Sequence, residues 1–162
     1  TNWKHTHSVR LEVTRQADLA IRALVTLGAG HVPTADGPSG KGAKAKLGTP
    51  GVRISARSFA EQFDTSAGFM SQVMNPLVKA GWISSVVGRT GGYKLEVPLE
   101  SLSVLDVVEL IDGPVDDGRC IVVGVPCESH EPCPMHSSWA PARKVLIDAL
   151  GERSLDQVKL GY

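Results

Sequence analysis

The chain has 162 residues, of which 42% are hydrophobic and 21% charged, with 17 basic and 17 acidic side chains. This length fits one domain with room for a small appendage, and the apolar fraction excludes wholesale disorder. No apolar run approaches the ~20 residues that a membrane helix needs, and the first five residues do not resemble a signal peptide. We therefore expect a soluble, cytoplasmic protein that does not insert into a membrane.

The charges are divided unevenly between the two halves of the chain. Residues 1–95 carry 12 Lys and Arg against 5 Asp and Glu, a balance of +7, whereas residues 96–162 carry 5 against 12, a balance of −7. A basic half can contact phosphates, and an acidic half would be repelled from a polyanion. Two solvated faces that happen to differ in charge would give the same sums.

An amphipathic helix is predicted over residues 14–27, because apolar residues recur there at helical spacing. Thr14 suits the N-cap, Asp18 lies in the first turns, where a carboxylate suits the helix dipole, and Gly28 is expected to end the helix. Residues 29–52 are rich in Gly, Pro, Ala, Ser and Thr and lack periodicity, so we expect a flexible insertion at the surface.

Two helices over residues 55–64 and 67–79, joined by a short turn, predict a helix-turn-helix. Pro76 is awkward inside the second helix, and Gly81 is expected to close it. The second helix would direct its polar side chains outward, where they can reach base edges or phosphates in a major groove. Helix pairs also occur without any role in DNA binding. The candidate DNA-contacting residues of this segment are Ser66, Gly68, Ser71, Gln72 and Asn75.

A β-hairpin is predicted directly after these helices, with strands near residues 82–87 and 93–97 and a Gly-rich turn between them. A hairpin in this place forms the wing of a winged helix-turn-helix domain. Arg89 lies at the hairpin tip, where it can enter a minor groove or hold a phosphate, unless it is only a solvated turn residue. The predicted fold class is therefore mostly α with a small β wing.

The C-terminal part begins with a helix that starts in a capping-box-like sequence at Ser103 and ends at Gly113. Residues 115–136 form a loop, in which we interpret the neighbouring carboxylates Asp116 and Asp117 as solvated. A long helix is predicted over residues 138–150 and a short turn over residues 154–158. The apolar strip of the long helix is either part of the core or the seam of a dimer.

Three cysteines lie within 14 residues of the loop, in the spacing C-x6-C-x5-C-x2-H: Cys120, Cys127 and Cys133, followed by His136. An odd number of thiols cannot all pair internally, so a disulfide framework is not expected. Structural zinc usually begins from more closely spaced cysteines. Thiolates in a loose loop that contains Gly and Pro suit an iron–sulfur cluster. Zinc and free redox-active thiols are the alternatives.

The wing sequence at residues 88–93, the helix at residues 105–114 and the three-cysteine loop together resemble the IscR/NsrR/RirA-type family of bacterial winged helix-turn-helix iron–sulfur transcription regulators. The resemblance covers residues 10–158 except the insertion. It implies a homodimer that binds a pseudo-palindromic operator in double-stranded DNA. It also implies a 2Fe–2S or 4Fe–4S cluster that senses nitric oxide, redox state or iron status.

The resemblance also implies two domains with different functions and a set of ligands for the cluster. Residues 10–97 would form the DNA-binding domain, and residues 98–162 the cluster-binding loop with a long C-terminal dimerisation helix. The family's cysteines match those of the loop, although the first interval is one residue longer than usual. The fourth ligand would be His136, as in IscR-like members, or Asp18 from the first helix across the dimer, as in NsrR-like members.

Four other functions are weighed against this one. The first is a metal-free regulator of the same fold whose thiols form a sulfenate or disulfide, and the second is a zinc-binding protein. An enzyme is disfavoured, because the sequence has no Gly-rich phosphate loop and no nucleophile elbow. An interaction module with a vestigial loop would not be expected to keep all three cysteines.

Overall fold

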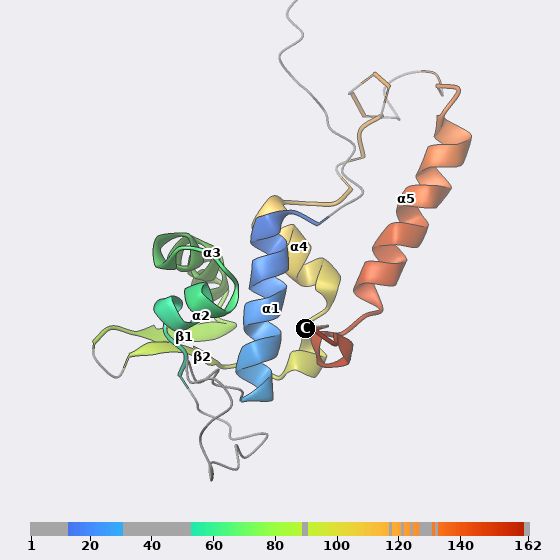
Figure 1. The fold of residues 1–162 in the computed structure, drawn as a ribbon. Coiled ribbons are helices and arrows are strands. Elements are labelled where there is room, and N and C mark those ends of the chain that lie inside the picture. Colours follow the sequence, from blue (N-terminus) through green and yellow to red (C-terminus); the bar gives the residue numbers. More distant parts are fainter. Residues whose placement is uncertain are drawn as a thin grey trace, which may run out of the picture.

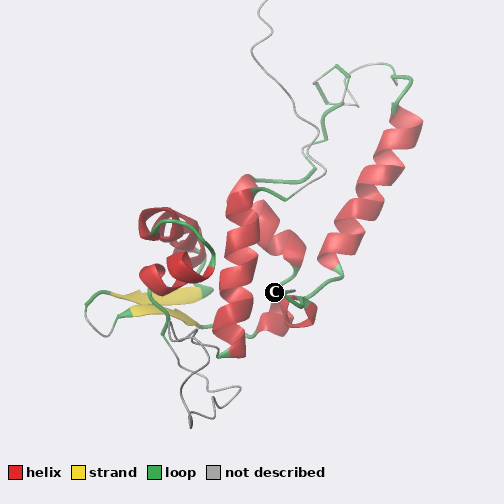
Figure 2. Cartoon of the chain, viewed as in Figure 1, coloured by secondary structure: helices red, strands yellow, loops and turns green. Residues whose placement is uncertain are grey.

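The computed structural model describes residues 13–30, 53–88, 91–116, 118–120, 122–123, 125–126, 131 and 133–160. Figures 1 and 2 show a helical protein with one small hairpin. In chain order its elements are α1 (Arg15–Ala29), α2 (Ala56–Gln62), α3 (Ala67–Lys79), β1 (Ile83–Val86), β2 (Gly92–Leu95), the 3-10 helix η1 (Leu99–Ser101), α4 (Val104–Asp112), α5 (His136–Gly151) and the 3-10 helix η3 (Leu155–Gln157). Residues 31–52 of the predicted insertion lie outside the described residues.

α1 begins where the sequence predicts and ends two residues later. The Thr14 hydroxyl accepts a hydrogen bond from the Ala17 amide at 3.2 Å, which confirms the predicted N-cap. The predicted end at Gly28 is wrong, because the helix continues to Ala29 and ends at Gly30 in the left-handed conformation. A Cβ on Gly28 would lie 2.3 Å from Cδ1 of Leu99. The missing side chain therefore lets η1 approach α1.

The predicted helix-turn-helix is confirmed. Ser55 and Ser66 cap α2 and α3, each accepting a hydrogen bond from the amide three residues further along. The turn between the helices places Asp64 at φ 49°, a conformation that aspartate tolerates better than most residues. Met70, rather than Phe69, is the buried residue in the first turn of α3, and Pro76 is accommodated inside this helix.

One hydrophobic core joins α1, the helix-turn-helix, the base of the wing and the segment from η1 to α4. Phe59, Leu24 and Leu77 are among its fully buried side chains. Leu102, Val107 and Leu155 belong to the same core. The core therefore continues across the domain boundary predicted between residues 97 and 98.

The wing is a two-stranded antiparallel hairpin in which Ile83 pairs with Leu95 and Val86 with Gly92. Ile54 extends it by an isolated bridge to Tyr93, with backbone hydrogen bonds of 3.0 and 2.8 Å. Gly92 has φ 143°, and a Cβ there would lie 2.8 Å from the carbonyl carbon and oxygen of Ile54. A glycine is thus required for the wing to join the helical body.

Gly92→Ala is expected to lower the free energy of unfolding by about 2–3 kcal/mol, through backbone strain and displacement of the Ile54 main chain. Urea denaturation followed by circular dichroism measures this loss. Gly68→Ala is the matched control, since a Cβ there meets no atom within 4 Å. Equal unfolding midpoints for the two variants would contradict this account of the wing.

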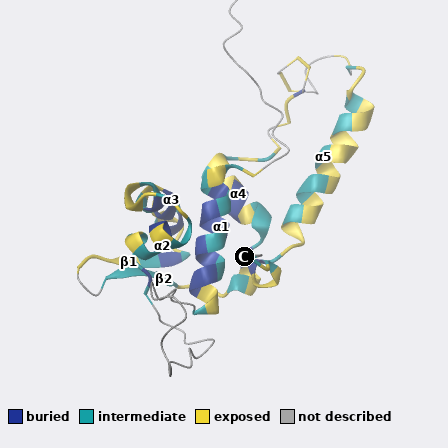
Figure 3. Ribbon diagram, viewed as in Figure 1, coloured by how far each residue is buried: buried dark blue, intermediate teal, exposed yellow. Residues whose placement is uncertain are grey.

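α5 stands apart from the rest of the molecule. In Figure 3 it carries no buried segment, and none of its residues, all of which the structure describes, is buried. Its C-terminal end meets α4, and Leu155 in η3 anchors the following turn in the core. None of the helices in the described part of the chain is long and apolar enough to cross a membrane.

Candidate DNA-binding surface and sensor loop

The outer face of α3 carries a stripe of exposed residues. Gly68, Gln72, Asn75 and Lys79 follow one another at intervals of three or four residues, so they share one face of the helix. The side chains of Gln72 and Asn75 make no hydrogen bond to other described residues, which leaves their amides available to a ligand. Sequence reasoning missed Lys79, although the same helical spacing points to it.

Two predicted DNA-contacting residues use their hydroxyl groups in hydrogen bonds to the backbone of α3. The exposed Ser66 hydroxyl accepts the hydrogen bond of the Phe69 amide at 3.1 Å. The half-buried Ser71 donates its hydroxyl hydrogen to the carbonyl of Ala67 at 2.9 Å. Both hydroxyls are thus less available than the amides of the stripe.

In the described part of the wing, the positive charge of Lys94 is partly neutralised by Glu96, and the end of the wing exposes an apolar side chain. Lys94 Nζ lies 3.6 Å from Oε1 of Glu96. The Ser84 hydroxyl donates a hydrogen bond to Glu96 at 2.6 Å and, together with the lysine, lowers the pKa of that carboxyl. Val87 is 99% exposed. Arg89, the predicted tip residue, lies outside the described residues.

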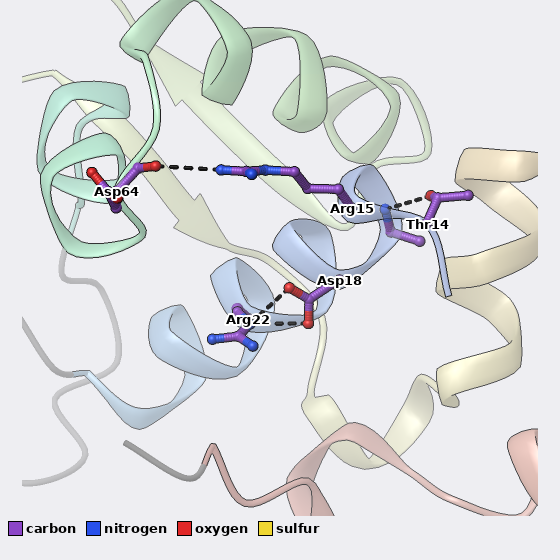
Figure 4. A network of polar contacts seen from close by, with 6 residues as sticks. Thr14, Arg15, Asp18, Arg22 and Asp64 are labelled. Atoms are coloured by element: carbon purple, nitrogen blue, oxygen red, sulfur yellow. Dashed lines mark hydrogen bonds and ion pairs between the residues drawn. The ribbon is translucent and has the colours of Figure 1, made fainter. Parts of the chain in front are cut away.

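The N-terminal end of α1 connects the end of α4 with the helix-turn-helix. The Thr14 hydroxyl donates to the carboxylate of Asp112 at 2.8 Å, and Arg15 donates to the main-chain oxygen of Asp64 at 3.3 Å. Figure 4 shows Thr14, Arg15 and Asp64 together with Asp18, whose two carboxylate oxygens each accept from Nε of Arg22 at 2.9 Å. Asp18 is half-buried and is already paired within its own helix.

The loop of residues 115–135, called the sensor loop after the role proposed for it below, brings two of its three cysteines into contact. Sγ of Cys120 lies 3.4 Å from Sγ of Cys133, and Cys120 is only 3% exposed. Two thiolates on one tetrahedral metal at about 2.3 Å would lie roughly 3.8 Å apart, so the pair fits a shared metal with a small adjustment. Cys127 lies outside the described residues.

Neither candidate for the fourth ligand lies with these thiols in the described part of the chain, which holds no group of three His, Cys, Asp or Glu residues suited to a metal. His136 is the first residue of α5, and its amide donates to the carbonyl of Cys133 at 2.9 Å. It is thus a near neighbour of that cysteine along the backbone, whereas Asp18 lies on α1.

Sequence reasoning missed the residue that ties the sensor loop to α5. Arg143 forms an ion pair with Asp116 and donates to the main-chain oxygen of Arg119 at 2.9 Å. The interpretation of Asp116 as a purely solvated carboxylate is therefore wrong, and Asp117 lies outside the described residues. No local pattern signals a contact between residues 27 positions apart.

Sequence comparisons find similar proteins among transcriptional regulators. The sequence profile of a family described as "Rrf2: Iron-dependent Transcriptional regulator" matches residues 45–159. The HTH-type transcriptional regulator IscR of Klebsiella pneumoniae (strain 342) is 30% identical over 99 residues, which are 61% of this chain and 60% of that protein.

Solved structures share the fold over nearly the whole chain. The oxidized form of Staphylococcus aureus CymR is 26% identical, with a TM-score of 0.62, over 93% of this chain and all of that one. T. potens IscR is 22% identical, with a TM-score of 0.58, over 94% of this chain and 95% of that one.

Proposed function

The chain belongs to the Rrf2 family of iron-dependent transcriptional regulators, and from this premise we propose that it is a homodimeric repressor whose operator affinity depends on an iron–sulfur cluster. It is a DNA-binding regulator and not an enzyme. The observation that carries the sensor part of the proposal is the 3.4 Å separation between the sulfurs of Cys120 and Cys133.

The proposed DNA contacts combine the α3 stripe with the wing. Gln72 and Asn75 would read base edges in a major groove, because their exposed amides can donate and accept at once. Ser66, Gly68 and Ser71 would lie along the same helix near the phosphates, and Arg89 would enter the adjacent minor groove from the wing. Two copies related by a two-fold axis would read half-sites about 34 Å apart in a pseudo-palindromic operator.

α5 is proposed as the dimerisation helix. It has no buried residue in the monomer, and Val145 on its surface is 68% exposed. An apolar helical strip left uncovered is typical of a protein–protein interface. Under this proposal residues 10–97 bind DNA, and residues 98–162 hold the sensor and the dimer contact.

Cys120, Cys127 and Cys133 are the proposed cysteine ligands, with Asp18 or His136 as the fourth. A bound 2Fe–2S or 4Fe–4S cluster would supply a centre that reacts with nitric oxide or oxidants and is lost when iron is scarce. Both carboxylate oxygens of Asp18 accept from Nε of Arg22 at 2.9 Å. For Asp18 to bind the cluster, these hydrogen bonds would have to break. His136, at the start of α5, is tied to Cys133 through the backbone, since its amide donates to the carbonyl of that cysteine at 2.9 Å.

A metal-free thiol switch is the second candidate, and the same sulfur contact favours it. A disulfide between Cys120 and Cys133 would need the sulfurs to approach from 3.4 Å to about 2.05 Å. The similarity to an oxidized form of CymR is in keeping with this alternative.

The DNA-binding part is tested by selection of the anaerobically reconstituted protein on random duplex DNA, followed by fluorescence anisotropy on the selected duplex. We expect a two-fold symmetric consensus and an affinity that falls steeply with added salt. Enrichment of no sequence, together with salt-independent binding, would refute the proposed role of α3.

Gln72→Ala is expected to weaken binding to the selected duplex by about 10- to 100-fold, because one base contact is worth roughly 1–3 kcal/mol. Binding to an unrelated duplex should hardly change, so the ratio of specific to non-specific affinity falls. Gln157→Ala replaces an exposed glutamine in η3 and serves as the control. An unchanged ratio for Gln72→Ala would remove this residue from the recognition surface.

A further inference from the structure

Arg143 makes three contacts that join the sensor loop to α5 or lie within that helix. Its guanidinium pairs with Asp116, donates to the carbonyl of Arg119 at 2.9 Å and lies 5.9 Å from the ring centroid of Trp139, one turn earlier on α5. The Arg143 side chain is 17% exposed. These contacts are therefore screened less by solvent than those of a typical surface ion pair.

The loop side of this contact is itself ordered by hydrogen bonds. The carboxylate of Asp116 also accepts from the amide of Gly118 at 2.8 Å, which closes a turn with Gly118 at φ 70°. The carbonyl of Arg119 belongs to the peptide plane that leads into Cys120. The Cys120 amide in turn donates to the carbonyl of Val125 at 2.8 Å. Fixing the Arg119 carbonyl thus fixes the backbone that carries the Cys120 thiol.

The other thiol is fixed to the same helix through the chain. Cys133 precedes α5, and its carbonyl accepts from the amide of His136 at 2.9 Å. Both thiols are therefore positioned relative to α5. Cys133 is connected to the helix through the backbone, and Arg143 binds the segment before Cys120.

We propose that Arg143 is a positioning residue that sets the distance between the Cys120 and Cys133 thiols by clamping Asp116 and the main-chain oxygen of Arg119 to α5. Because both thiols are tied to α5, a movement of this helix that breaks the Arg143 contacts changes the separation of the sulfurs, whereas one that carries the loop along does not. The regulatory consequence rests on the proposed function, since it requires that α5 is the dimer helix and that the loop is the sensor. The positioning role does not require a metal.

The test measures thiol proximity without iron. In metal-free protein carrying Cys127→Ser, the two remaining thiols reduce oxidised glutathione, which yields the protein disulfide and two reduced glutathione molecules. The equilibrium constant of this exchange reports the effective concentration of one thiol at the other. We expect Arg143→Gln to lower it about tenfold, a change of roughly 1.4 kcal/mol.

The controls separate the clamp from general effects of charge on α5. Lys144→Gln removes the neighbouring cation, which pairs only with Asp148 among the described residues, and should leave the exchange constant unchanged. Asp116→Asn removes the other partner from an exposed loop position, so it keeps the test informative if Arg143→Gln does not fold. The double variant should lose no more than Arg143→Gln alone, as expected for two groups that act through one contact.

The inference would be overturned if Arg143→Gln and Lys144→Gln had equal exchange constants, or if the effects of Arg143→Gln and Asp116→Asn were additive in the double variant. It would also be overturned if the metal-free protein with Cys127→Ser alone formed no disulfide at excess oxidised glutathione. Failure of the proposed function looks different, because it appears as absence of iron from the reconstituted wild-type protein.

Discussion

Cys120→Ser is expected to abolish cluster binding, so that the reconstituted variant retains less than about a tenth of the wild-type iron. The replaced thiol is buried and lies 3.4 Å from the sulfur of Cys133, and a serine hydroxyl is a far poorer ligand for iron than a thiolate. Iron and acid-labile sulfide are measured after anaerobic reconstitution and desalting. Cys127→Ser and Cys133→Ser should behave in the same way.

Dimer content and far-ultraviolet circular dichroism control for misfolding in these cysteine variants, and both should match the wild type. Full iron retention in any one of them would remove that cysteine from the ligand set. The same assay distinguishes the candidates for the fourth ligand, because only one of Asp18→Asn and His136→Ala should accelerate the loss of iron. Asp156→Asn in the exposed part of η3 is the control.

Val145→Asp is expected to convert the dimer into a monomer, with a dimer dissociation constant at least about 100-fold higher, because a carboxylate without a partner would be buried in an apolar seam. Val145 is 68% exposed in the monomer, so the subunit should still fold. Sedimentation equilibrium measures the dissociation constant, and operator affinity should fall with it.

Ala140→Asp places the same carboxylate on another, exposed face of α5 and is the matched control. It should leave the dimer intact. If both variants remain dimeric at the wild-type dissociation constant, then α5 does not form the dimer interface, which must lie on another surface of the protein.

Local patterns predicted the helix-turn-helix well, because its signals lie within a few residues of one another. The bounds of α3 follow from the Ser66 cap and the apolar spacing, and the bounds of α4 from the capping box at Ser103. Gly28 misled the prediction for a tertiary reason. Its lack of a Cβ accommodates Leu99, which lies 71 positions away, instead of ending the helix.

The candidate site could be predicted only in part. Cysteine spacing pointed to the loop in which the sulfurs of Cys120 and Cys133 lie 3.4 Å apart, and helical spacing predicted the outward direction of Gln72 and Asn75. The contact between Arg143 and Asp116 depends on how α5 folds back along the loop, which no short pattern encodes. Asp18 and Arg22 form an i, i+4 ion pair, which their spacing in the sequence permits. Asp18 was interpreted only as a carboxylate that suits the helix dipole and as a possible ligand, and this pair was not predicted.

The visible absorption spectrum of anaerobically purified wild-type protein, together with its iron and sulfide content, tests the central claim most directly. We expect brown protein with matching iron and sulfide that bleaches on exposure to nitric oxide or air. Colourless protein without iron, even after anaerobic reconstitution, would contradict the cluster and leave the paired thiols of Cys120 and Cys133 as the sensor.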